Sequence, residues 1–309
     1  MRYSLNALYA SQHISKQAVL EHFAREQADR ELISSLLPRV DAERSRHPGC
    51  GLEKLYWKLA PEGIGRDKFC GIFMELGYGV RPVRRRWRTT FSVFTVFENL
   101  IESRLVTGPN QVWQSDTTYI KVGRQWCYLT FIIDVYTREI LGYASSRSLR
   151  AEANLRALKR ALSQVEPHEL VGLIHHSDRG RQYHSASYLQ LLRRYGIQVS
   201  MGQIAQDNAY AERINGIIKA EYIQHWVPQA FAQLKRYTRK AVEHYNRERL
   251  HRGLDRQAPR TFLNRWKQQE VQQRKIQVIY SLESPKFMEG NLHKCVSSAQ
   301  GPICVLSVN

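Results

Sequence analysis

The chain has 309 residues, enough for two or three domains with at least one sizeable core. It carries 46 Lys and Arg against 28 Asp and Glu, so its formal net charge is +18 and its isoelectric point is near 9.9. This excess points to a polyanionic partner, most simply nucleic acid. No apolar run reaches transmembrane length and no secretory signal precedes the chain, which excludes a membrane protein and predicts a soluble cytoplasmic one.

The cysteines also indicate a cytoplasmic protein. Their number is odd, and they form neither a Cys-x-x-Cys pair nor a His/Cys pair with metal-ligand spacing. We therefore expect reduced thiols and no small zinc-binding domain. The five are Cys50, Cys70, Cys127, Cys295 and Cys304.

Residues 1–78 are predicted to be helical. Apolar side chains recur at i, i+3, i+4 and i+7 over 52–59 and again over 69–76, and Pro61 and Gly63 interrupt the two helices. Two short helices about a tight turn are typical of a helix-turn-helix that enters the major groove of DNA, with Arg66 and Lys68 exposed for phosphate contact. A plain helical hairpin packed on the core is the alternative. Further upstream, we expect helices over 5–9 and 15–23, the second capped by Ser15.

Residues 79–110 are expected to be a basic linker. They hold Gly, Pro and Ser turns and a run of arginines, Arg84, Arg85 and Arg86, followed by Trp87. A charge run is usually only solvated, but these side chains are candidate DNA contacts, and the indole of Trp87 can stack on a base.

From residue 111 the apolar pattern changes from helical spacing to the alternation of strands, and the segment 111–266 is predicted to be an α/β core. The expected strands are 111–121, 126–136, 138–145, 170–176 and 197–200, and the expected helices are 151–164, 184–195 and one that begins near Asp207 or Asn208. This order is that of a ribonuclease-H-like mixed sheet flanked by helices. The tail, 267–309, has no predicted role.

Three acidic residues, Asp116, Asp178 and Glu212, lie in this core at strand and helix positions that converge on one edge of a sheet. Carboxylates brought together repel and raise one another's pKa, so a divalent cation is their natural partner. Oxygen ligands alone favour Mg²⁺ or Mn²⁺ over zinc. The alternative is that each is an ordinary surface acid.

The motifs around these residues resemble those of bacterial insertion-sequence transposases with a retroviral-integrase-like core, in particular the protein of the second reading frame. The resemblance covers roughly residues 45–265. Its segments are Trp113-x-x-Asp116-x-Thr118-Tyr119, Asp134-x-x-x-Arg138, His176-Ser177-Asp178-x-Gly180, Asp207-Asn208-Ala209-x-Ala211-Glu212 and Tyr245-Asn246-x-x-Arg249-x-His251.

The resemblance implies that Asp116, Asp178 and Glu212 bind two catalytic Mg²⁺ or Mn²⁺ ions per site. The 33 residues between the last two are two fewer than in much of the family. Asp207 is a competing third ligand, although an Asp at a helix start is more often a cap. Glu221 is interpreted as a surface residue, and His175 and His176 as packing residues. Lys219, two helical turns after Glu212, is a candidate DNA-phosphate contact.

The predicted function is a transposase, a polynucleotidyl transferase that cleaves and joins DNA strands. Its partners would be double-stranded element ends and target DNA, further copies of the chain in a synaptic complex, and an upstream-frame helix-turn-helix protein. The alternatives are a catalytically dead DNA-binding regulator and a ribonuclease-H-like nuclease without joining activity.

Overall fold

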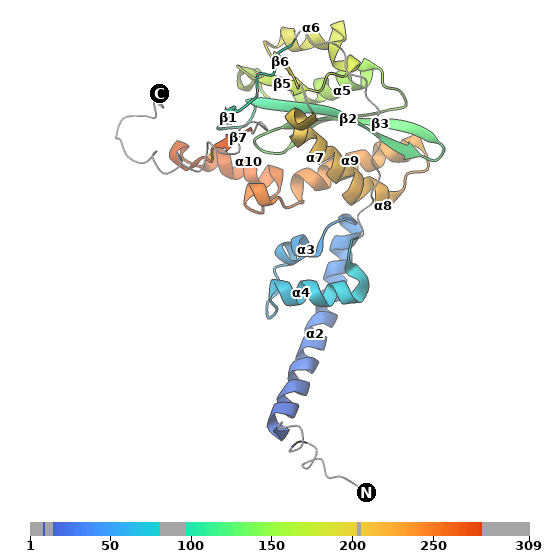
Figure 1. Cartoon of the computed structure of the whole chain (residues 1–309), viewed down its shortest axis with the longest axis vertical. Helices are drawn as coiled ribbons and strands as arrows, with labels where there is room; N and C mark the ends of the chain where they lie inside the picture. The colour runs from blue at the N-terminus through green and yellow to red at the C-terminus, as the bar shows by residue number, and fades with distance from the viewer. Residues whose placement is uncertain (1–8, 10–14, 81–96, 203–204, 280–309) are drawn as a thin grey trace.

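The computed structural model describes residue 9 and residues 15–80, 97–202 and 205–279. A five-stranded sheet with the order β4-β3-β2-β5-β6 forms the centre of its larger part (Figure 1). β2, β3 and β4 are antiparallel neighbours, whereas β5 and β6 are added parallel to β2. The strands are β2 (Val112–Val122), β3 (Gln125–Asp134), β4 (Ile140–Ser146), β5 (Ile174–Ser177) and β6 (Gln198–Met201). This mixed sheet confirms the ribonuclease-H-like prediction.

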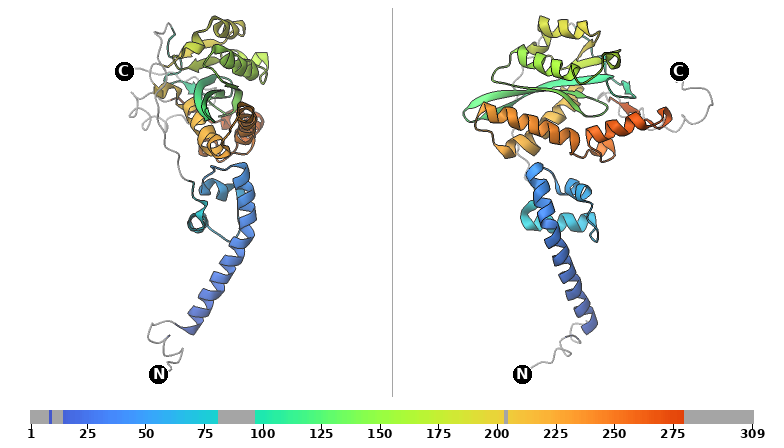
Figure 2. Two further views of the ribbon diagram at one scale, coloured as in Figure 1. Left: turned by 90° about the vertical axis from the view of Figure 1, so that its right-hand side faces the viewer. Right: turned by 180° about the vertical axis from the view of Figure 1, so that it is seen from behind.

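Helices cover both faces of the sheet, as the two views of Figure 2 show. One face packs on α5 (Ala151–Leu162) and α6 (Ala186–Arg194), and the other on α7 (Ala209–Ile218) and α9 (Phe231–Arg247). Between α7 and α9 lie a π-helical turn, η5 (Lys219–Ile223), and the short α8 (Gln224–Trp226). Alternation along β3 sends Ile132 to the first cluster and Phe131 to the second. Burying each such side chain stabilises the fold by about 2 kcal/mol.

Part of the expected linker is folded onto this core. β1 (Leu105–Val106) pairs with β7 (Gln277–Val278), and Ile101, Val106 and Ile279 are buried beside α10 (Pro259–Gln268). The linker prediction is wrong for residues 97–110, because their apolar side chains have a surface on which to pack. Arg84, Arg85, Arg86 and Trp87 lie outside the described residues, as does the tail from 280 onward.

The N-terminal part forms a helical unit of three helices, α2 (Lys16–Arg46), α3 (Leu52–Leu59) and α4 (Arg66–Phe73). Ser15 caps α2 as predicted, by accepting a hydrogen bond from the N–H of Ala18. α2 extends far beyond the predicted 15–23. Its second half packs on α3 and α4, whereas its first half has no buried face. No helix among the described residues is long and apolar enough to span a membrane.

β5 begins four residues later than predicted. Pro167–Leu170 forms a 3-10 turn closed by a capping box, and Gly172 has a φ of 78°. Leu170 and Leu173 are buried, whereas Val171 is 85% exposed. The apolar run 170–174 is therefore divided between a turn and a strand. Hydrophobic periodicity alone does not show where in such a short run the strand begins.

Candidate active site

Asp116 lies in the middle of the central strand, β2, on the face that α7 covers. Both of its carboxylate oxygens are held: the N–H of Thr117 donates to Oδ1 at 2.8 Å, and Asn215 Nδ2 on α7 donates to Oδ2 at 2.7 Å. Burial, and then the charges of Asp178 and Glu212, raise the pKa of Asp116 to about 7. The two hydrogen bonds oppose that rise but do not cancel it.

Asp178 follows directly after β5, the parallel neighbour of β2. In the parallel pairing of β2 with β5, Ser115 lies opposite Ser177. The residues that follow them, Asp116 and Asp178, therefore lie at the same edge of the sheet. The N–H of Gly180 donates to Asp178 Oδ1 at 3.0 Å and fixes the turn. Burial raises the pKa of Asp178, and the Gly180 N–H opposes this rise.

Glu212 lies in the first turn of α7, and side chains tie the start of that helix to β2. Gln114 Oε1 accepts the N–H groups of Tyr210 and Ala211, each at 3.2 Å, while Asn208 Nδ2 donates to the carbonyl of Ser115 at 2.9 Å. Asn208 occupies the cap position but makes no capping hydrogen bond with its side chain. Asn208 therefore does not cap the helix locally, and Gln114 on the strand satisfies two of the helix N–H groups instead.

The three carboxylates act on one another across this edge. Burial and then the charge of Asp178 raise the pKa of Glu212. The charges of Asp178 and Glu212 in turn raise the pKa of Asp116. The two-residue deletion before α7 has therefore not removed Glu212 from the other two. In the described residues, however, the three do not bring ligand atoms within 4.8 Å of one another. An oxygen-only donor set of this kind fits Mg²⁺ or Mn²⁺ better than zinc.

Two family descriptions match this region, both named "Integrase core domain", over residues 106–206 and 195–259. A protein of insertion element IS600 from Shigella sonnei is 35% identical over 226 residues, 71% of this chain and 82% of that protein. The transposase of IS629 from the same organism is 32% identical over 242 residues, 76% of this chain and 80% of its own length. The chain belongs to the insertion-sequence transposase family.

Among solved structures, the catalytic core domain of HTLV-2 integrase in complex with magnesium is 19% identical, with a TM-score of 0.40, over 53% of this chain and 99% of that one. Membership of the integrase-core family makes this transposase a polynucleotidyl transferase that acts on DNA and implies the use of a divalent metal. Family membership thereby confirms the predicted family and activity, and a dead regulator or a simple nuclease is not favoured.

Lys219 lies beside the carboxylates of the transposase, in η5. Its Nζ donates to Thr118 Oγ1 at 3.3 Å and lies 4.9 Å from the centre of the Tyr119 ring. Thr118 is two residues from Asp116, hence on the same face of β2. Burial lowers the pKa of Lys219, and the charge of Asp116 opposes this.

The basic residues predicted in the helical unit lie apart from the carboxylates. Arg66 and Lys68 are exposed on α4 and form ion pairs with Asp67 and Asp29. Exposed ion pairs of this kind are weak, so Arg66 and Lys68 can exchange their carboxylate partners for a DNA phosphate.

The interpretation of Glu221 as a surface residue is wrong. Its side chain is only 14% exposed, and Arg249 binds it through two nitrogens at 2.7 and 2.8 Å. His175 and His176 are buried; His175 Nε2 hydrogen-bonds to the hydroxyl of Tyr188, and His176 Nδ1 to that of Ser200.

Two residues at the site were not predicted, Asn215 and Gln114. Asn215 lies three residues after Glu212, so helical spacing alone places both on one face of α7. Gln114 carried no such signal, because its partner is the first turn of a helix nearly a hundred residues away.

Proposed function

We propose that Asp116, Asp178 and Glu212 are the metal-binding catalytic carboxylates of this transposase. The observation that supports this most is the raised pKa of Asp116, about 7, which arises from burial and from the two other carboxylates. A site that repels its own negative charge favours a bound cation. The three carboxylates would hold two Mg²⁺ or Mn²⁺ ions, which would supply activation of the attacking oxygen and charge neutralisation at the leaving oxygen.

The protein's own part in this reaction is orientation. Thr117 and Asn215 fix the two oxygens of Asp116, and each oxygen keeps a second lone pair for a cation. The N–H of Gly180 does the same for one oxygen of Asp178. The ammonium of Lys219 is close enough to the carboxylates to bind a phosphate of the same DNA strand.

The DNA partners would bind over a wider surface. We assign phosphate contacts to Arg66 and Lys68 on α4 and to the arginines of 84–86. Such contacts position a duplex without reading its sequence. An upstream-frame helix-turn-helix protein would then supply the choice of element ends, and a homo-oligomer would hold two ends together.

A nicking assay on duplex oligonucleotides tests the metal requirement. Activity should need Mg²⁺ or Mn²⁺ and should survive a zinc-selective chelator. Ca²⁺ should support DNA binding but little cleavage, because its looser coordination supports in-line geometry poorly. Full activity in metal-free buffer would refute the proposal.

A further inference from the structure

The helical unit approaches the catalytic core closely at one backbone contact. The N–H of Gly49, in the turn after α2, donates to the carbonyl of Glu221 at 2.8 Å. A Cβ atom at Gly49 would lie 2.3 Å from Glu221 Cα and 2.7 Å from the carbonyl oxygen of Ala220. Both obstacles are backbone atoms, so any residue other than glycine must push the two parts of the chain apart.

A largely buried group of ion pairs around Glu221 lies beside this contact. Glu221 binds Arg249 of the core, and Lys54 on α3 reaches the same carboxylate at 2.7 Å. Although burial raises the pKa of Glu221, the hydrogen bonds and charges of Arg249 and Lys54 bring it below its ordinary value. Glu221 is therefore ionised at neutral pH, and it has partners in both parts of the molecule.

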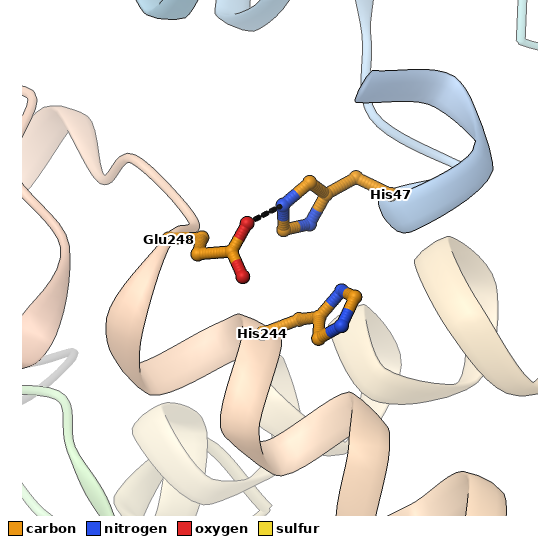
Figure 3. Close-up of side chains that lie close together, drawn as sticks. All are labelled: His47, His244 and Glu248. Carbon is orange, nitrogen blue, oxygen red and sulfur yellow. Dashed lines mark hydrogen bonds and ion pairs between the residues drawn. The ribbon is translucent and has the colours of Figure 1, made fainter. Parts of the chain in front are cut away.

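A second polar cluster links the end of α2 to α9. His47, His244 and Glu248 bring ligand atoms within 4.8 Å of one another, and in the described residues they are the only such group of three (Figure 3). Lys58 Nζ lies 2.8 Å from His47 Nε2 and 3.2 Å from Glu248 Oε2. Burial and then Lys58 lower the pKa of His47 to about 4, so its ring is neutral.

The ammonium of Lys58 thus lies against two of the three members of this cluster, His47 and Glu248. The second nitrogen of His47 bonds to the hydroxyl of Tyr222 at 2.9 Å, and Nδ1 of His244 bonds to the carbonyl of Arg46 at 2.8 Å. The cluster is therefore a polar contact between the two parts of the chain, in which Lys58 pairs with Glu248.

These contacts converge on η5, which continues α7 without a break. Glu221 and Tyr222 belong to that π-helical turn, and Glu212, Asn215 and Lys219 precede them along the same helical stretch. π-helical turns occur frequently at functional sites. Glu221 and the turn of α7 that carries Glu212 therefore belong to one continuous helical stretch.

We propose that the helical unit is docked on the core as a positioning element. By holding Glu221 through Gly49 and Lys54, it would fix the orientation of the helix that carries Glu212. Gly49, Lys54 and Glu221 would be positioning residues, since they touch neither substrate nor metal. The inference rests on the metal-binding role proposed for Glu212.

The sharpest test is Gly49→Ala in the full chain, compared with Gly51→Ala. A Cβ atom at Gly51 would meet nothing within 4 Å, and its φ of −68° suits alanine. For Gly49→Ala we expect the Mn²⁺ concentration for half-maximal nicking to rise about tenfold, as for other changes behind a metal ligand. Nicking at saturating Mn²⁺ should fall by a factor on the order of ten to a hundred. Gly51→Ala should match the wild type in both.

Lys54→Met provides a second variant that leaves the backbone contact intact. Its control is Glu53→Gln on the same helix, which removes a surface charge that pairs with Arg252 and leaves Glu221 untouched. Lys54→Met should raise the half-maximal Mn²⁺ concentration and Glu53→Gln should not. A lower melting temperature with unchanged Mn²⁺ dependence in both Gly49→Ala and Lys54→Met would mean a merely structural contact and overturn the proposal.

Asp116→Asn, assayed in parallel, separates this inference from the proposed function. If Asp116→Asn is inactive while Gly49→Ala and Lys54→Met keep wild-type Mn²⁺ dependence, only the positioning role fails. If Asp116→Asn is active, the proposed metal site fails and the positioning role fails with it.

Discussion

Asn215 Nδ2 donates to Asp116 Oδ2 at 2.7 Å, which joins the helix of one carboxylate directly to the strand of another. Asn215 lies one helical turn after Glu212, so this hydrogen bond adds to those of Gln114 and Asn208 in holding α7 against β2. It also lowers the pKa of Asp116 against the effect of burial. Asn215 therefore influences both the geometry and the charge of the site.

Asn215→Ala should weaken metal binding. Without the hydrogen bond, the pKa of Asp116 should rise above about 7, so less of the carboxylate is ionised at neutral pH. We expect the half-maximal Mn²⁺ concentration for nicking to rise about tenfold and to recover partly at higher pH. Gly216→Ala is the control, because a Cβ atom there meets nothing within 4 Å. Equal Mn²⁺ dependence in both variants would contradict the role of Asn215.

Asp116→Asn should stabilise the metal-free protein at high pH. The pKa of Asp116 is raised from 3.8 to about 7 in the folded state, so the folded chain retains a proton that the unfolded chain loses in this range. The wild type therefore loses stability as pH rises through this window, and the amide variant does not. At about pH 8 the variant should be more stable by about 4 kcal/mol, or about 6 °C in melting temperature.

Thermal unfolding in chelator at about pH 5 and about pH 8 measures this difference. Added Mg²⁺ should raise the melting temperature of the wild type at the higher pH but not that of Asp116→Asn, because a ligand stabilises only the state that binds it. Asp207→Asn is the control. A difference between wild type and Asp116→Asn that is the same at both pH values would show that Asp116 titrates normally.

Gln114→Ala should destabilise the start of α7. Its side chain satisfies two N–H groups of that helix, and loss of a helix cap typically costs about 1 kcal/mol. Because Glu212 lies in the same turn, nicking should fall more than the loss of folded protein explains. Gln111→Ala, which breaks only exposed hydrogen bonds to Thr107, should change neither. Unfolding in urea together with nicking at a temperature where both variants are folded distinguishes the two effects.

Much of the core could be predicted from the sequence because its signals are local. Alternation gave β2, β3 and β4 to within a few residues, and Asp116 and Asp178 follow from their places on adjacent strands. Contacts between distant segments had no such signal. Gln114 as a cap and Glu221 as a buried ion-pair partner each depend on packing that no short window of sequence contains.

The arginines of 84–86 should contribute to DNA affinity through counterion release. Each of Arg84→Ala, Arg85→Ala and Arg86→Ala should reduce the slope of log affinity against log salt by about one unit for duplex DNA. Fluorescence anisotropy over a range of salt concentrations measures the slope. An unchanged slope in all three variants would remove this segment from the DNA-binding surface.

The chain alone should discriminate element ends poorly. Phosphate contacts carry little sequence information, so cognate and scrambled duplexes should bind with nearly equal affinity at physiological salt. A ratio of about a thousand or more, typical of specific binders, would contradict the need for an upstream-frame partner.

The central claim is that Asp116, Asp178 and Glu212 together perform metal-dependent strand transfer. The most direct measurement is strand transfer of duplex oligonucleotides carrying element ends, in Mg²⁺ and in Mn²⁺, by Asp116→Asn, Asp178→Asn, Glu212→Gln and Asp207→Asn. The first three should lose activity by about 100-fold or more while binding duplex DNA as the wild type does, and Asp207→Asn should remain active. Wild-type transfer by Glu212→Gln, with loss of transfer by Asp207→Asn, would contradict the assignment of the third carboxylate.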